Sequence, residues 1–153
     1  MRVDGFTRSF INEGYSLAEL LVVLACMAVV TTAAVPNIAH LQGIWTLWGD
    51  TRNLEASMHW GRQYAIAANT SVLFEIDESG QKYYWVDGTA GDIYSESIRH
   101  LSRDALIVAS PKRSLRFYQN GNAAPAGTFT LKSGAGSYSV VVSPGGRIRI
   151  QKN

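Results

Sequence analysis

Two arginines near the C-terminus have a spacing that suits the binding of phosphate groups. They lie in the segment Gly146-Arg147-Ile148-Arg149, which alternates basic and apolar residues. On a β-strand, residues two apart share a face, so Arg147 and Arg149 are expected to project together while Ile148 and Ile150 turn toward the core. Guanidinium groups about 6 to 7 Å apart suit successive phosphates of a nucleic acid. In a second interpretation the same arginines are solvated or pair with neighbouring subunits, and Gly146 only turns a hairpin.

The distribution of charge is one-sided, although the formal net charge is only +2. No acid follows Asp104, and every charged residue beyond it is basic. Such an end favours an anionic partner such as double-stranded DNA or a membrane surface, or else is a solvated basic face. The bases that can widen a patch around Arg147 and Arg149 are Lys152, Lys132, Lys112, Arg113 and Arg116.

No set of residues with catalytic or metal-binding spacing emerges. His40, His59 and His100 are scattered, with no cysteine or acid at the spacing of metal ligands. The glycines at 134 and 136 fit a flexible loop better than a phosphate cradle, because no strand-to-helix context follows them. The sequence therefore predicts no enzyme activity, no cofactor and no metal site.

A long uncharged segment near the N-terminus carries one acid at its start. From Leu20 to Ala39 there is no charged side chain, and a helix of this length spans roughly 30 Å, the thickness of a bilayer's hydrocarbon core. Glu19 stands at the head of this segment, where an unpaired carboxylate is costly, and it is therefore a functional candidate. Cys26 lies within the segment as a small apolar filler, and as the only cysteine it allows no intrachain disulfide.

The segment that follows is expected to continue as an amphipathic helix to about Asn69. Pro36 falls late in the uncharged run and predicts a kink. Trp45 and Trp48, one turn apart, are expected to pack in the core or to contact a membrane interface or other subunits. Apolar and small residues recur at helical steps and form the predicted core face: Leu47, Leu54, Met58, Gly61, Ala65 and Ala68.

Beyond Asn69 the apolar period changes to two, and turn dipeptides separate short runs. The expected fold is α+β, with a long N-terminal helix whose outer half packs on an antiparallel β-sheet. The predicted strands cover residues 71–76, 82–86, 106–109, 114–118, 128–131, 137–143 and 147–151.

The N-terminal residues Gly14-Tyr15-Ser16-Leu17-Ala18-Glu19-Leu20 resemble the type IV prepilin processing motif. The resemblance implies that a membrane-bound prepilin peptidase cuts between Gly14 and Tyr15 and methylates the new N-terminus of Tyr15. It divides the chain into a leader (1–14), a transmembrane and assembly helix (15–40) and a soluble pilin domain (41–153). Glu19 would set subunit register by pairing with the freed amine of a neighbouring subunit in a layer of low dielectric.

The order and spacing of the C-terminal strands are similar to those of the minor pilins and pseudopilins that include FimT, FimU and the H pseudopilin of type II secretion (GspH), and most of all to the FimT-like members. The resemblance implies a protein of the bacterial inner membrane with a periplasmic domain, later assembled with other pilins in or at the tip of a pilus. Gly146, Arg147 and Arg149 match the Gly-Arg-x-Arg tail implicated in DNA binding during natural transformation. The alternative is a GspH-like pseudopilin of type II secretion that binds no DNA, and both interpretations stay open.

Overall fold

The computed structural model describes residues 16–153, and the expected cleavage site at Gly14 and Tyr15 lies outside this range. The chain divides into two compact units, the first ending at Ile38 and the second spanning Ala39–Asn153. Helix α1 (Leu17–Ala67) contributes to both units, and Pro36 lies within it.

In the first unit, α1 starts at Leu17 with Ser16 as its cap, because the Ser16 hydroxyl accepts a hydrogen bond from the Ala18 N–H at 3.3 Å. The apolar side chains from Leu20 to Val30 are exposed in the single chain. Of the helices in the described part of the chain, none has both the length and the apolar character needed to cross a membrane.

In the second unit, the part of α1 that ends at Ala67 buries one face. The side chains of Leu47, Leu54, Met58 and Ala65 follow heptad-like steps of seven and four residues and are almost wholly buried. The helix ends slightly earlier than predicted, because Asn69 adopts a φ of 50° and the Thr70 N–H bonds back to the Ala65 carbonyl. The prediction for Ala68 was therefore wrong, since this residue lies past the helix and is exposed.

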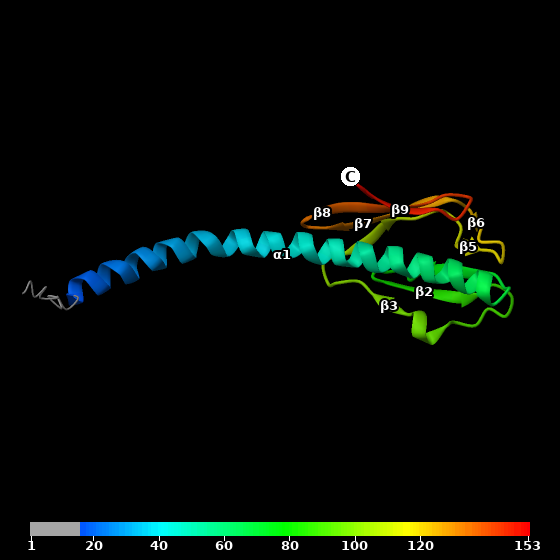
Figure 1. Cartoon of the computed structure of the whole chain (residues 1–153), viewed down its shortest axis with the longest axis horizontal. Coiled ribbons are helices and arrows are strands. Elements are labelled where there is room, and N and C mark those ends of the chain that lie inside the picture. The colour runs from blue at the N-terminus through cyan, green and yellow to red at the C-terminus, as the bar shows by residue number, and fades with distance from the viewer. Residues whose placement is uncertain (1–15) are drawn as a thin grey trace, which may run out of the picture. The chain divides into compact units, whose positions relative to one another are not determined.

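Two antiparallel sheets pack beside this part of α1 (Figure 1). The first sheet has the order β3-β2-β1-β5-β6 and the second the order β4-β7-β8-β9. All seven predicted strands are present, and two strands of two residues each, β3 and β6, were not predicted. The bounds are β1 Val72–Ile76, β2 Lys82–Asp87, β3 Arg99–His100, β4 Leu106–Ala109, β5 Leu115–Phe117, β6 Ala123–Ala124, β7 Gly127–Ser133, β8 Gly136–Val142 and β9 Ile148–Lys152, with a short 3-10 helix η1 at Ser95–Ser97.

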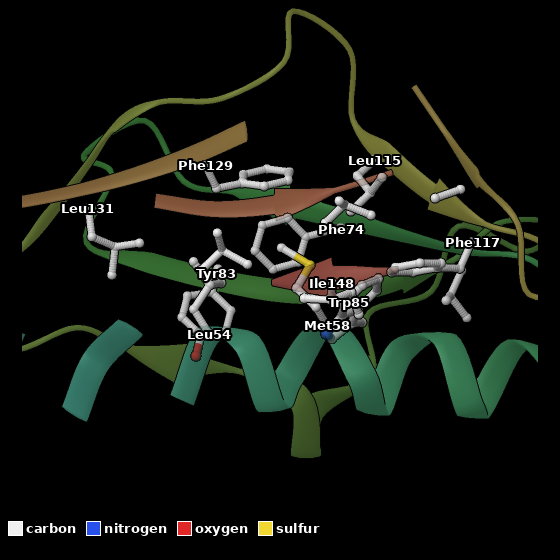
Figure 2. Packing of buried hydrophobic residues seen from close by; sticks show 14 of the residues in the cluster. Leu54, Met58, Phe74, Tyr83, Trp85, Leu115, Phe117, Phe129, Leu131 and Ile148 are labelled. Carbon is white, nitrogen blue, oxygen red and sulfur yellow. The ribbon is translucent and has the colours of Figure 1, made fainter. Parts of the chain in front are cut away.

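Aromatic side chains fill the space between α1 and the two sheets. In Figure 2, Leu54 and Met58 rise from α1 toward side chains of both sheets. Phe74 of β1 and Phe129 of β7 join the sheets in an edge-to-face contact with ring centroids 5.3 Å apart. Gly61 lets α1 approach closely, because a Cβ there would lie 2.5 Å from the ring of Trp85.

Backbone hydrogen bonds also fasten the two sheets together at two corners. The Ile107 N–H of β4 donates to the Gly80 carbonyl in the β1–β2 turn at 2.9 Å. The Ala123 N–H of β6 donates to the Pro144 carbonyl in the β8–β9 turn at 2.8 Å. The second corner holds the segment in which the candidate arginines lie.

Candidate nucleic-acid interface

The turn that precedes the arginines is shaped by Gly146. Its N–H donates to the Ser143 carbonyl at 2.9 Å, and the next N–H, of Arg147, donates to the Ser143 hydroxyl at 3.1 Å. Gly146 has a φ of +74°, a left-handed conformation that favours glycine. It is buried, and a Cβ at this position would overlap the carbonyl oxygen of Gly121. The glycine of the Gly-Arg-x-Arg segment is thus required by the fold itself.

The two arginines project from the outer face of the second sheet. Arg147 lies directly before β9 and Arg149 within it, and both are exposed. Ile148 is 8% exposed and Ile150 is half-buried on the opposite face, as the alternation predicts. The apolar residues anchor the strand, so the two guanidinium groups are presented side by side on a rigid element.

Lys132 shares this outer face at some distance from the arginines. In β7 it alternates with the buried Phe129 and Leu131, and it is exposed. Lys132 is paired with Ser137 of β8, whereas Arg149 is paired with Val141. Arg149 thus lies four residues along the strands and two strands across from Lys132, so the Cα atoms of these two residues are about 17 Å apart. Lys132 therefore extends the basic face without joining the arginine pair.

Lys152 lies on the other face of β9, so its predicted place in the arginine patch was wrong. By alternation it follows Ile148 and Ile150, and it lines an open apolar groove of about 480 Å³ with Trp45 and Trp48. The sequence already indicates this face, because Lys152 lies an even number of residues after Ile148.

The tryptophans in this groove differ in exposure. Trp48 is half-buried, with its ring centroid 5.2 Å from that of Tyr138 and with the Arg52 guanidinium 5.0 Å above it. Trp45 is 70% exposed. The packing role expected for the pair holds for Trp48.

Neither arginine forms an ion pair with an acid within residues 16–153. Over residues 16–153 the ion pair found is between Arg52 and Glu55, at 2.8 Å within one turn of α1. In the same range, no three His, Cys, Asp or Glu side chains gather closely enough to hold a metal ion. The exposed cations of this face can therefore interact with a phosphate backbone directly.

Glu19 occupies the first turn of α1 and is exposed. Ser16 as the cap and Glu19 three residues later form the Ser-x-x-Glu pattern of a capping box. This local pattern was not predicted from the sequence, and it places Glu19 in the first turn, where a carboxylate can stabilise the start of its own helix in addition to any role between subunits.

Arg62 of α1 is a further residue that the sequence did not single out. Its Nε donates to the Gly121 carbonyl at 3.0 Å, across 59 positions of sequence, and its side chain packs against Gly146. Arg62 thereby ties the end of α1 to the two turns of this corner. Nothing in the local pattern around Arg62 indicates such a distant partner.

An acid and a tyrosine form a second polar contact that the sequence did not reveal. Hydrogen bonds from the backbone N–H groups of Ala90 and Thr89, and from the Tyr94 hydroxyl, hold the pKa of Asp87 below its usual range. Burial and the Asp87 carboxylate raise the pKa of Tyr94. Tyr94 also meets Tyr64 edge-on, with centroids 5.0 Å apart. This contact fixes the loop after β2.

Comparison with known proteins gives the family. The family described as "Type II transport protein GspH" matches residues 50–146. The minor pseudopilin EpsH from the type 2 secretion system of Vibrio cholerae has a similar fold, with a TM-score of 0.57 and 12% identity over 69% of this chain and 96% of that one. The type IV minor pilin FimU of Pseudomonas aeruginosa strain PAO1 has a TM-score of 0.59 and 19% identity over 69% of this chain and 87% of that one.

No curated protein matches the chain. The matched family and the two similar folds are those of structural proteins rather than enzymes. The chain therefore belongs to the GspH family, and its fold is similar to those of a minor pseudopilin and a type IV minor pilin.

Proposed function

We propose that this chain is a FimT-like minor pilin that binds double-stranded DNA through Arg147 and Arg149. The observation that carries the proposal is the exposure of both guanidinium groups on one face of a strand anchored by Ile148. Residues two apart on a strand lie about 6 to 7 Å apart, which suits neighbouring phosphates, and an arginine fork can donate two hydrogen bonds to each phosphate. Lys132 lies farther away on the same face and can contact another phosphate of the DNA.

A salt titration of DNA binding tests this proposal. Full-length protein purified in detergent is titrated into a labelled three-turn duplex, and fluorescence anisotropy is measured between about 50 mM and 200 mM salt. Each phosphate contact contributes about −0.9 to the slope of log K against log salt, so Arg147→Gln with Arg149→Gln should reduce the slope by about 1.8. Arg99→Gln with Arg103→Gln removes the same charge from exposed positions on or near β3 and should leave the slope unchanged. Equal slopes for parent and tail variant would exclude the tail as the site.

The second candidate is a GspH-like pseudopilin of type II secretion that binds no DNA. It is favoured by the family match, which ends at Gly146 before the arginines, and by the fold similarity to EpsH. The same titration separates the two candidates. A parent protein whose anisotropy does not rise with the duplex even at low salt supports the pseudopilin.

We also propose that the chain is made as a precursor, cut by a prepilin peptidase between Gly14 and Tyr15, and methylated at Tyr15. The uncharged segment 20–39 would hold it in the inner membrane, with residues 41–153 in the periplasm, until the chain assembles with other pilins. The support is the sequence motif and the length of the uncharged run. Mass spectrometry of the protein from its native host should find a chain that starts at N-methylated Tyr15, and any other N-terminus contradicts the proposal.

The proposed role of Glu19 in subunit register can be separated from helix capping. Glutamine completes a capping box as glutamate does, but it carries no charge to pair with a neighbour's amine. Glu19→Gln should therefore leave the helix content of the protein unchanged and abolish its recovery in sheared filaments. A variant that assembles like the parent would leave Glu19 with the capping role alone.

A further inference from the structure

A hollow on the outer face of the first sheet brings two more arginines together, away from the tail. It has a volume of about 510 Å³, and its polar lining consists of Arg113, Ser114, Arg116 and Tyr118. Leu115 and Phe117 of β5 face the core, so the alternating residues 114, 116 and 118 share the outer face. The strand thus presents a guanidinium flanked by two hydroxyl groups.

Among the residues that the structure describes, no acid lines this hollow or pairs with its arginines. Arg116 is half-buried, and the residues paired with it across the sheet are the neutral Leu73 and Ala124. Glu75 follows Leu73 by two positions on β1 and is the nearest acid by register. It does not line the hollow, and within the described part of the chain it pairs with neither arginine. A partly desolvated cation in such a place is stabilised by a bound anion.

We propose that this hollow binds a phosphodiester group of a nucleic acid backbone, with Arg113 and Arg116 on the phosphate oxygens. The hydroxyl groups of Ser114 and Tyr118 can donate to the same oxygens. Tyr118 is 39% exposed, and its ring gives a base a surface for stacking. The volume exceeds that of a lone phosphate and lies in the range of nucleotide-sized ligands.

This inference rests on the proposed binding of DNA, but it uses different residues. The two basic sites are connected through the corner at which Ala123 bonds to Pro144. The backbone path from Arg116 to its partner Ala124, and then across that corner to Arg147, limits the Cα separation of the two arginines to about 25 Å. One helical turn of DNA is about 34 Å long, so a single duplex is long enough to reach both.

The test uses full-length protein and the same labelled duplex and salt titration. Arg113→Gln with Arg116→Gln should reduce the salt slope by about 1.8, since two phosphate contacts are lost. Arg116→Lys keeps the charge and should retain the slope, and Glu75→Gln removes the nearby negative charge and should tighten binding. The matched control is again Arg99→Gln with Arg103→Gln. Thermal melting of each variant verifies that it folds.

The outcomes separate this inference from the proposed function. A hollow variant that binds like the parent, while the tail variant loses affinity, overturns the inference and leaves the tail as the site. If only the hollow variant loses DNA affinity, the result supports the inference and excludes Arg147 and Arg149 as the site. A parent that does not bind the duplex overturns both. Calorimetric binding of inorganic phosphate, abolished in the hollow variant without any change in DNA affinity, would assign the hollow to a free anion and also overturn the inference.

Discussion

Replacing Gly146 by alanine should destabilise the second unit more than any other single-methyl change in the β8–β9 turn. An L-residue in the left-handed conformation costs about 1 to 2 kcal/mol. The new Cβ would also overlap the Gly121 carbonyl oxygen, which is backbone and cannot rotate away. Separating the two turns breaks the bond from Ala123 to Pro144 and the bond from Arg62 to Gly121, each worth about 1 kcal/mol. The expected loss is about 3 to 4 kcal/mol.

Thermal unfolding of the full-length protein, followed by tryptophan fluorescence, measures this loss. At about 4 °C per kcal/mol for a domain of roughly this size, Tm should fall by about 12 to 16 °C. Gly145→Ala is the matched control, because no atom lies within 4 Å of its Cβ position and its φ is not left-handed. Equal Tm values for the two variants would refute the close contact between the turns. If Gly146→Ala lowers both Tm and DNA binding, the loss of binding is attributed to the displaced turn, since glycine offers no side chain to a ligand.

Two further predictions concern the helix and the response to acid. Gly61→Ala should lower the free energy of unfolding by about 1 to 3 kcal/mol through overlap with Trp85, whereas Gly49→Ala, with open space around it, should raise this free energy by about 1 kcal/mol in chemical denaturation. The pKa of Asp87 is depressed in the folded state, first by the hydrogen bond from the Ala90 N–H. Its contribution to stability is therefore present above the unfolded pKa of about 4 and is lost as pH falls through the lower folded pKa. Asp87→Asn keeps the hydrogen-bond acceptor and should flatten the decline of Tm with acid, and an unchanged decline would contradict this reasoning.

Local pattern predicted most of the secondary structure of this chain. The change of apolar period from helical steps to alternation after Asn69 placed seven strands, because each buries one side of a pleated ribbon. β3 and β6 were missed because two residues cannot display a period. The prediction for Lys152 failed for a different reason, because it followed charge alone and not strand alternation. Lys152 lies two residues after Ile150, and alternation places it on the face of the apolar residues.

The partners across the fold were not predictable in the same way. The close approach of Gly121 and Gly146, and the bond from Arg62 to the first of them, join segments far apart in sequence. The sequence marks both glycines as turn residues, but turn chemistry carries no information on which turns meet. The hollow around Arg116 was missed for this reason also, since its apolar walls come from β1, from β6 and from the proline that follows β6.

The two corner bonds between the sheets restrict where the chain can change length. An insertion in the β1–β2 turn would displace Gly80 from Ile107, and an insertion in the β8–β9 turn would displace Pro144 from Ala123. The loop that contains Gly91 does not join the two sheets in this way, because its hydrogen bonds run to Asp87 at the end of β2, and Gly91 itself is exposed with open space around it. Peptide tags and fluorescent labels belong in that loop, and length variation among natural homologues should concentrate there rather than at the corners.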